Sequence, residues 1–351
     1  MASEVTPLTA NVSERAAALH QKAIVIDALT TSLINANQAD RMRRGGLTAT
    51  NHTAAYYTLD FADAVADIVR VRRQIEARPN DFTLVNSVAD IESAKTEGKA
   101  AIILGLQNAR PIADRLEFVD ALHALGVRVI QLTYNERNYV ADGCTEPSDA
   151  GLSQFGRQLV GEFNRQGILI DLSHCGYRTT RETIEASECP VAITHANPLA
   201  LSRSPRNKPD DILKSLAERG GVLGLCTWTP MSHRGNGRRP LLADLLDMIE
   251  YAVDLIGVDH VGVGTDHGED VYIQADWERK WGPNGLYPNV TGGLGDWYGF
   301  NARYVDGLHS AALFPNLTEG LLQRGYADED VLKIVGGNFL RLFRETWREA
   351  S

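Results

Sequence analysis

The 351-residue sequence predicts an α/β protein whose eight parallel strands close into a (β/α)8 TIM barrel. Two observations lead to this fold class. Short β-branched apolar runs alternate with amphipathic helical segments along the whole chain, and glycines mark the points where helices end before strands. Strand-helix alternation indicates a parallel sheet with helical crossovers, and eight repeats indicate closure into a barrel.

The expected elements follow from these patterns. Apolar runs predict strands at 23–27, 47–53, 100–106, 128–133, 168–172, 191–194, 222–227 and 260–265. Helical periodicity predicts helices at 62–76, 116–125, 154–166, 180–187, 210–219 and 241–256. The helix-ending glycines are Gly98, Gly126, Gly167, Gly220 and Gly257, which suit a left-handed position after the last helical turn.

Two long stretches interrupt the alternation. Residues 30–46 follow the first strand, and residues 267–314 follow the last, where barrel enzymes place active-site loops. We therefore expect one barrel domain over 1–351, with an N-terminal extension at 1–22 and a lid-like insertion at 267–314. The insertion carries Trp277, Trp281, Trp297 and Tyr298. Alternatively, the insertion at 267–314 is a structural loop that does not contact a ligand.

Composition and charge exclude several classes of protein. Hydrophobic residues make up 44% and charged residues 23%, which is typical of a globular protein and not of a disordered or disulfide-stapled one. The formal net charge of −10 disfavours nucleic acid and anionic membrane as partners. Residues 1–22 lack the basic-then-apolar order of a signal peptide. We expect a cytoplasmic protein with its four cysteines reduced.

Polar residues follow the expected strands, at the end where a barrel has its active site. They are Asp27, Asn51, His52, Gln107, Asn108, Tyr134, Asn135, His174, His195, Thr227, Asp266 and His267. Each buried polar group must be hydrogen bonded or lose solvation energy, so their repeated occurrence here indicates a functional site.

Three of these residues suggest metal or acid-base chemistry. His174 and His195 end consecutive strands, so one zinc or iron ion could bind both imidazoles. Asp266 follows an apolar strand with two glycines and is a candidate general acid/base. The alternatives are hydrogen-bonded core histidines and a carboxylate that caps the next helix. Arg206 lies just beyond the sixth strand and could bind a carboxylate or oxyanion, or could be a solvated loop residue.

At these motifs the chain resembles the renal, or membrane, dipeptidase family of zinc peptidases, which are amidohydrolase-type (β/α)8 barrels. The resembling segments are Ile24-Val-Ile-Asp27, Asp171-Leu-Ser-His174, Thr194-His195, Pro205-Arg206-Asn207-Lys-Pro-Asp210, Gly262-Val-Gly-Thr-Asp266, Phe314-Pro-Asn-Leu-Thr318, Leu322-Gln-Arg-Gly325 and Ile334-Val-Gly-Gly-Asn338-Phe-Leu-Arg341. The resemblance therefore covers nearly the whole chain and implies a hydrolase that often forms dimers.

Four family positions are changed in this sequence. Where the family has a His-x-Asp metal pair after the first strand, this chain has Leu29 and Thr31. The glutamate that bridges two zinc ions corresponds to Gln107, and a histidine that helps bind the tetrahedral intermediate corresponds to Tyr134. Because a neutral amide is a poor ligand for such cations, the resemblance implies a site that departs from two-zinc chemistry.

Four family positions are retained. His174 and His195 match imidazole ligands of one zinc, Arg206 matches the arginine that binds the substrate carboxylate, and Asp266 matches the catalytic aspartate. We assign metal binding to His174 and His195 and catalysis to Asp266 and Tyr134. Substrate binding is assigned to Arg206, Gln107 and Asn135, because amides and a phenol can hydrogen bond an oxyanion or a carbonyl.

Three functions remain open from the sequence. The first is a dipeptidase-like metallohydrolase of a small peptide or amide bond, with zinc or another divalent metal, at most one per chain. The second is a metal-free or non-hydrolytic enzyme, such as an isomerase, tautomerase or lyase, on a small zwitterionic metabolite. The third is a degenerate small-molecule binding protein. In each case we expect a small-molecule partner, no nucleic acid, no membrane and a homodimer.

Overall fold

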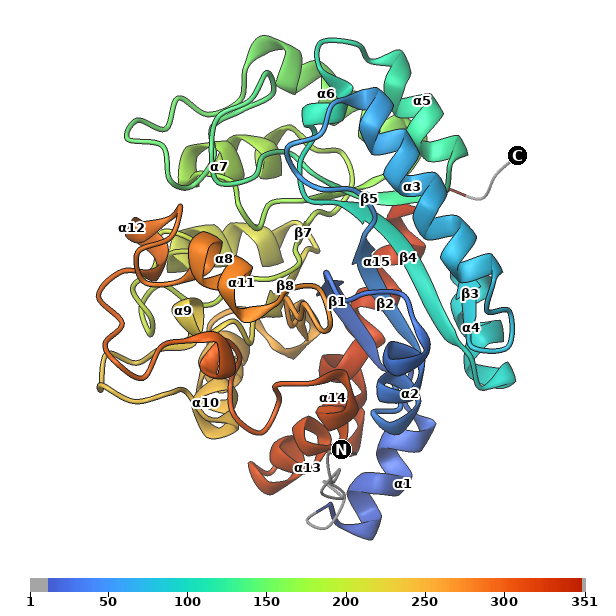
Figure 1. The fold of residues 1–351 in the computed structure, drawn as a ribbon, viewed down its shortest axis with the longest axis vertical. Coiled ribbons are helices and arrows are strands. Elements are labelled where there is room, and N and C mark those ends of the chain that lie inside the picture. The colour runs from blue at the N-terminus through green and yellow to red at the C-terminus, as the bar shows by residue number, and fades with distance from the viewer. Residues whose placement is uncertain (1–11, 349–351) are drawn as a thin grey trace.

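The computed structural model describes residues 12–348 and shows eight parallel strands in a nearly closed barrel with helices between them (Figure 1). The strands are β1 (Ile26–Thr30), β2 (Ala49–Thr53), β4 (Ala100–Leu106), β5 (Val127–Gln131), β6 (Leu169–Asp171), β7 (Ala192–Ile193), β8 (Val222–Leu225) and β9 (Val261–Val263). Each pairs with the next in that order, and β3 (Phe82–Leu84) pairs with β4 outside the ring. The predicted (β/α)8 fold class is confirmed.

Helices follow the strands and surround them. They are α1 (Glu14–Lys22), α2 (Ala36–Arg44), α3 (Phe61–Glu76), α4 (Val88–Glu97), α5 (Glu117–Ala124), α6 (Gln154–Gln166), α7 (Tyr177–Ala186), α8 (Asp210–Glu218), α9 (Thr229–Ser232), α10 (Leu242–Ile256), α11 (Gln274–Trp281), α12 (Pro288–Thr291), α13 (Phe314–Gln323), α14 (Asp328–Leu332) and α15 (Asn338–Thr346). Ser153 caps α6 by accepting from the Gly156 amide at 2.9 Å. All five glycines predicted to end helices have positive φ.

Most expected elements lie where the patterns placed them, with shifts at some ends. The first strand was expected at 23–27 and pairs at Ile26–Thr30. Residues 23–30 are apolar except for Asp27 and Thr30, and this pattern cannot show which part of the segment pairs. Helix α2 lies inside residues 30–46, which were read as a loop, and β3 was missed because it is three residues long. Of the expected N-terminal extension, 1–11 lie outside the described residues.

The seam between β1 and β9 closes the ring through few backbone contacts. Thr30 bridges His267 in parallel, and the Thr31 amide donates to the His267 carbonyl at 2.7 Å. Asp27 in β1 accepts from the Thr265 amide at 2.8 Å and from its hydroxyl at 2.5 Å. Burial raises the pKa of Asp27 to about 7. A side-chain clamp thus supplements sparse backbone pairing at this seam.

The amino-terminal end of the barrel is filled by apolar side chains, which leaves the carboxyl end for the site. Phe339 and Phe343 of α15 pack with inward residues of the strands, among them Ile26 and Val222. A β-carbon on Gly262 would lie 2.6 Å from the Phe339 ring.

Within residues 12–348, no helix combines the length and apolar character required to cross a bilayer.

Replacement of Gly264 should test how tightly the strands approach one another beside the site. A β-carbon there would lie 1.9 Å from the Thr194 carbonyl oxygen, so Gly264→Ala must displace backbone. We expect it to lower the free energy of unfolding by about 2 kcal/mol, measured by urea titration.

Gly161→Ala is the matched control, because Gly161 lies within α6 and a β-carbon there would meet nothing within 4 Å. It should stabilise the protein by about 0.5–1 kcal/mol through helix propensity. Equal effects of the two substitutions would contradict the close approach at Gly264.

Candidate active site

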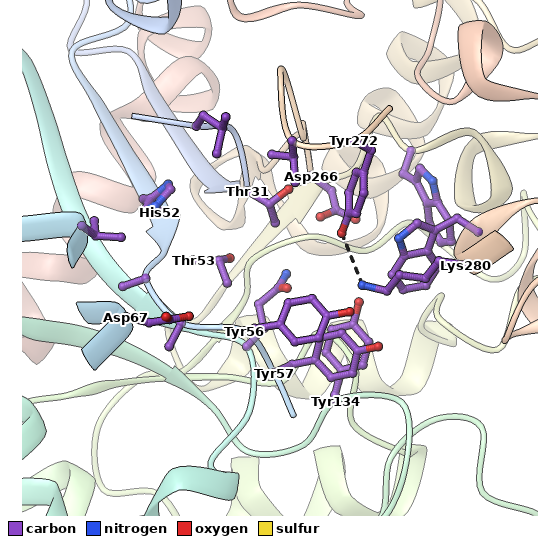
Figure 2. A pocket seen from close by; sticks show the side chains of 18 of the residues that line it. Thr31, His52, Thr53, Tyr56, Tyr57, Asp67, Tyr134, Asp266, Tyr272 and Lys280 are labelled. Carbon is purple, nitrogen blue, oxygen red and sulfur yellow. Dashed lines mark hydrogen bonds between the residues drawn. The ribbon is translucent and has the colours of Figure 1, made fainter. Parts of the chain in front are cut away.

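A cavity of about 260 Å³ lies at the carboxyl ends of the strands (Figure 2). Six of the seven residues assigned from sequence line it, namely Gln107, Tyr134, Asn135, His174, Arg206 and Asp266. The seventh, His195, is fully buried behind His174. Other lining residues come from the stretch after β9, including Tyr272, Trp277, Lys280 and Trp281. The structure therefore brings the strand-end residues into one place.

The two histidines meet at their Nε2 atoms. His174 follows β6 and His195 follows β7, and their Nε2 atoms are 3.0 Å apart. Nδ1 of His174 lies 2.7 Å from Asn135 Oδ1, and Nδ1 of His195 lies 2.8 Å from Thr194 Oγ1. A hydrogen bond at Nδ1 therefore fixes the orientation of each ring, with its Nε2 directed at the other ring.

The hydrogen-bond partners determine which ring nitrogens carry protons. Asn135 Oδ1 can only accept, so Nδ1 of His174 donates to it. Thr194 gives its hydroxyl proton to Asp171 Oδ2 at 2.7 Å, so its oxygen accepts from Nδ1 of His195. Both neutral rings then direct an Nε2 lone pair at the other.

The two Nε2 atoms are 3.0 Å apart, and their facing lone pairs repel unless a positive centre or a hydrogen-bond donor lies between or beside them. Burial and the nearby Arg206 charge hold the pKa of both histidines well below the usual value, which favours neutral rings. Gln107 Nε2 lies 3.5 Å from His195 Nε2 and is the nearest amide donor. Neutral imidazoles with converging lone pairs are the form in which histidine binds a metal.

This donor set fits a single metal ion better than a pair. Nitrogens bound tetrahedrally at about 2.0–2.1 Å from zinc lie roughly 3.3 Å apart, close to the observed separation. Among residues 12–348, no group of three His, Cys, Asp or Glu side chains is placed to hold a metal. The residues present therefore do not fit a two-metal centre, and the two imidazoles are the groups that would hold a single ion.

Asp266 is a strained and poorly solvated carboxyl group at the cavity wall. Its φ of 59° lies in the left-handed region, which Asp and Asn tolerate better than other non-glycine residues. Its amide donates to the Leu29 carbonyl at 3.0 Å, which holds this conformation. Burial raises its pKa to about 7, while the charges of Arg206 and Lys280 oppose the rise. The group can therefore exchange a proton near neutral pH.

Tyr134 forms the middle of a stack of rings. Its ring lies 4.0 Å from that of His174 and 3.7 Å from that of Tyr57, nearly parallel to the latter. Burial and the charge of Asp266 hold the pKa of its phenol well above the usual value, so the hydroxyl is a proton-bearing donor. The stacking fixes the ring position that a hydrogen bond to substrate requires.

Arg206 is buried beneath the site. Its guanidinium donates to the carbonyl of Ser173 and to that of His195 at 3.3 Å. These bonds connect the two strand ends that carry the histidines. A guanidinium has five N–H donors, so further donors remain for a substrate carboxylate.

Sequence reasoning did not single out Lys280, Tyr57 or Tyr272 as site residues. Lys280 lies on α11 with only 9% of its surface exposed, and Tyr57 follows β2. For Lys280, the one local signal is its place between two tryptophans in Trp277-Glu-Arg-Lys-Trp281. Its approach to the cavity depends on how the stretch after β9 folds back.

A barrel with paired histidines after neighbouring strands and an aspartate after the last belongs to the amidohydrolase-like class of fold. The family model described as membrane dipeptidase, peptidase family M19, matches residues 13–279 and 290–351. The chain therefore belongs to the membrane dipeptidase family.

The chain is similar to several known proteins. An amidohydrolase from Pseudomonas aeruginosa is 36% identical with a TM-score of 0.86, covering 95% of this chain and 99% of its own. A metallopeptidase from Rhodobacter sphaeroides, liganded with a phosphinate mimic of the dipeptide L-Ala-D-Ala, is 20% identical with a TM-score of 0.75, covering 92% and 100%. Dipeptidase aclJ of Aspergillus oryzae is 30% identical over 80% of this chain. The chain spans 60% of that relative's length.

Removal of the Thr194 hydroxyl should test the tautomer network. Thr194→Val keeps the shape but deprives His195 Nδ1 of its acceptor. We expect a 10- to 100-fold loss of zinc affinity, measured by competition with a chromophoric chelator.

Thr50→Val is the matched control, because the Thr50 hydroxyl is buried and has no hydrogen-bond partner within the described part of the chain. It should leave zinc affinity unchanged. If Thr194→Val also left it unchanged, the orientation of His195 would not depend on this hydroxyl.

Proposed function

We propose that the protein is a dipeptidase-like hydrolase of a small peptide or amide bond, with at most one metal ion held by His174 and His195. The observation that carries the proposal is the convergence of two imidazole lone pairs at a cavity lined by Asp266, Tyr134 and Arg206. Membership of the membrane dipeptidase family supports the reaction class.

The chain's own groups have separate roles in this reaction. Asp266 accepts a proton from the attacking water and returns it to the leaving amine, which a pKa near neutrality permits. Tyr134 donates a hydrogen bond to the oxyanion that develops on the carbonyl. Arg206 binds the substrate carboxylate with the donors left free by Ser173 and His195.

The remaining groups position this machinery. Asn135, which was assigned to substrate binding from the sequence, instead orients His174 through its Oδ1, as Thr194 orients His195. Gln107 contributes an amide to the substrate carbonyl. His174 and His195 would hold a divalent cation, which would supply Lewis-acid polarisation of the scissile group when bound. The aromatic residues after β9 reduce the access of bulk water and so strengthen each electrostatic contact.

The second candidate is proton transfer without a metal, as in an isomerase, tautomerase or lyase. It is favoured by the finding that no third metal-binding side chain joins the histidine pair within residues 12–348. In that case the two Nε2 atoms share one proton across their 3.0 Å separation. A protein that only binds a small zwitterion is the third candidate.

Metal analysis separates the first two functions. We expect about one zinc or other divalent ion per chain by mass spectrometry of protein purified without chelator, because two imidazoles converge at one point. His174→Ala should abolish both the metal and dipeptide hydrolysis.

Hydrolysis that persists after metal removal would refute the metallohydrolase and favour proton-transfer chemistry. Two ions per chain would show that groups other than a carboxylate at position 107 complete a second site.

The pH dependence of activity should follow Asp266. The ionised carboxylate is the active base and its pKa is raised to about 7, so activity is present above pH 7. We expect kcat/KM to fall about tenfold per pH unit below pH 7. Asp266→Asn should lower kcat/KM at least a hundredfold at pH 8, measured on the same dipeptide.

The residual activity of Asp266→Asn provides the internal check. It should show no acid limb near pH 7. An unchanged acid limb in this variant would assign the titration to another group.

A further inference from the structure

A lysine within the aromatic wall of the cavity plays no part in the reaction derived above. Lys280 lies on α11, and its Nζ is 4.3 Å from the ring centre of Tyr56, 4.6 Å from Trp281 and 4.8 Å from Tyr57. Nζ also donates to the Tyr272 hydroxyl at 3.3 Å (Figure 2). The ammonium is thus surrounded by π faces and a phenol.

This ammonium has no anionic partner in the described part of the chain. Among residues 12–348 its Nζ forms no ion pair within 4 Å. Its side-chain hydrogen bond is to Tyr272, and Asp266 acts on it only through space. Aromatic faces and one hydroxyl compensate only part of the lost solvation of a buried cation. Burial accordingly lowers the pKa of Lys280 to about 7, against the opposing effect of the Asp266 charge. An anion entering the cavity would supply the missing partner.

The charges around the cavity favour an anionic ligand. Arg70 and Asp67 pair with each other at 2.8 Å and so cancel. That leaves two cations, Arg206 and Lys280, and one carboxyl group, Asp266, beside neutral histidines. A zwitterionic dipeptide leaves this balance positive even before a bound metal ion is counted, and an additional carboxylate on the ligand reduces the excess positive charge.

We propose that Lys280 and Tyr272 form an anion-binding subsite for a second carboxylate, so that the preferred substrates are dipeptides with an acidic side chain. This inference rests on the proposed function, in which Arg206 binds the first carboxylate. Lys280 sits on the wall contributed by the stretch after β9, and Arg206 sits on the barrel side. The two cations therefore bind different groups of one ligand.

The test compares glycyl-glutamate with glycyl-glutamine, in both configurations of the second residue, because the pair differs in charge and hardly in shape. The wild-type protein should hydrolyse the glutamate peptide with at least tenfold higher kcat/KM. Lys280→Met should remove this preference through a higher KM with kcat retained, and Lys280→Arg should keep part of it. Rates are measured at pH 7, where Lys280, with its pKa of about 7, still carries much of its charge. The ratio of the two peptides is compared within each variant, so a change in the ionisation of Asp266 affects both peptides alike.

Arg279→Met is the matched control, because Arg279 is the neighbouring residue on α11 and its side chain is 81% exposed. It should leave both substrates unaffected. Near-UV circular dichroism of Lys280→Met shows whether the aromatic wall has collapsed. If it has, the subsite is tested by the glutamate preference of the wild-type protein and of Lys280→Arg.

Binding is measured separately from turnover, by calorimetry with both peptides in Asp266→Asn and in Asp266→Asn with Lys280→Met. If the glutamate peptide binds at least tenfold more weakly once Lys280 is replaced, the subsite stands even where no hydrolysis is found and the proposed function fails. Equal hydrolysis of both peptides by wild-type and Lys280→Met protein would overturn the subsite and leave the hydrolase intact.

Discussion

The buried carboxylate of Asp171 is the group on which the geometry of the site depends. It accepts from the amide and hydroxyl of Ser173 at 3.0 and 2.5 Å and from those of Thr194 at 3.0 and 2.7 Å. Because the Thr194 hydroxyl is committed to Asp171, its oxygen is left to accept from His195. One acid at the end of β6 therefore determines where a neighbouring imidazole directs its lone pair.

The same arrangement recurs at the seam between β1 and β9. Asp27 at β1 binds the amide and hydroxyl of Thr265, just before Asp266. In both places an acid on one strand binds a threonine that immediately precedes a functional residue on the neighbouring one. The strand ends are thus fixed by side chains where the short strands β7 and β9 offer few backbone bonds.

The fold and the strand-end residues could be predicted from sequence because both depend on local pattern. Apolar runs and glycines indicated the barrel, and the closed barrel brings residues such as His174 and Asp266 to one rim. The role of Thr194 could not be predicted, since a tautomer depends on hydrogen bonds between strands. Lys280 was missed for a related reason. The aromatic residues around it in the sequence are a weak signal, and tertiary packing of the stretch after β9 is what brings its side chain to the cavity.

The neutral amide of Gln107 has an evolutionary consequence. Glutamine and glutamate codons differ by a single base, and Gln107 already lies 3.5 Å from His195 Nε2. One nucleotide change would therefore place a carboxylate beside the imidazole pair without altering side-chain shape. The positions of Leu29 and Thr31 would still lack the ligands that the family carries there. Ligand charge can thus appear at this one position in a single step, whereas a two-metal site would need changes at several positions together.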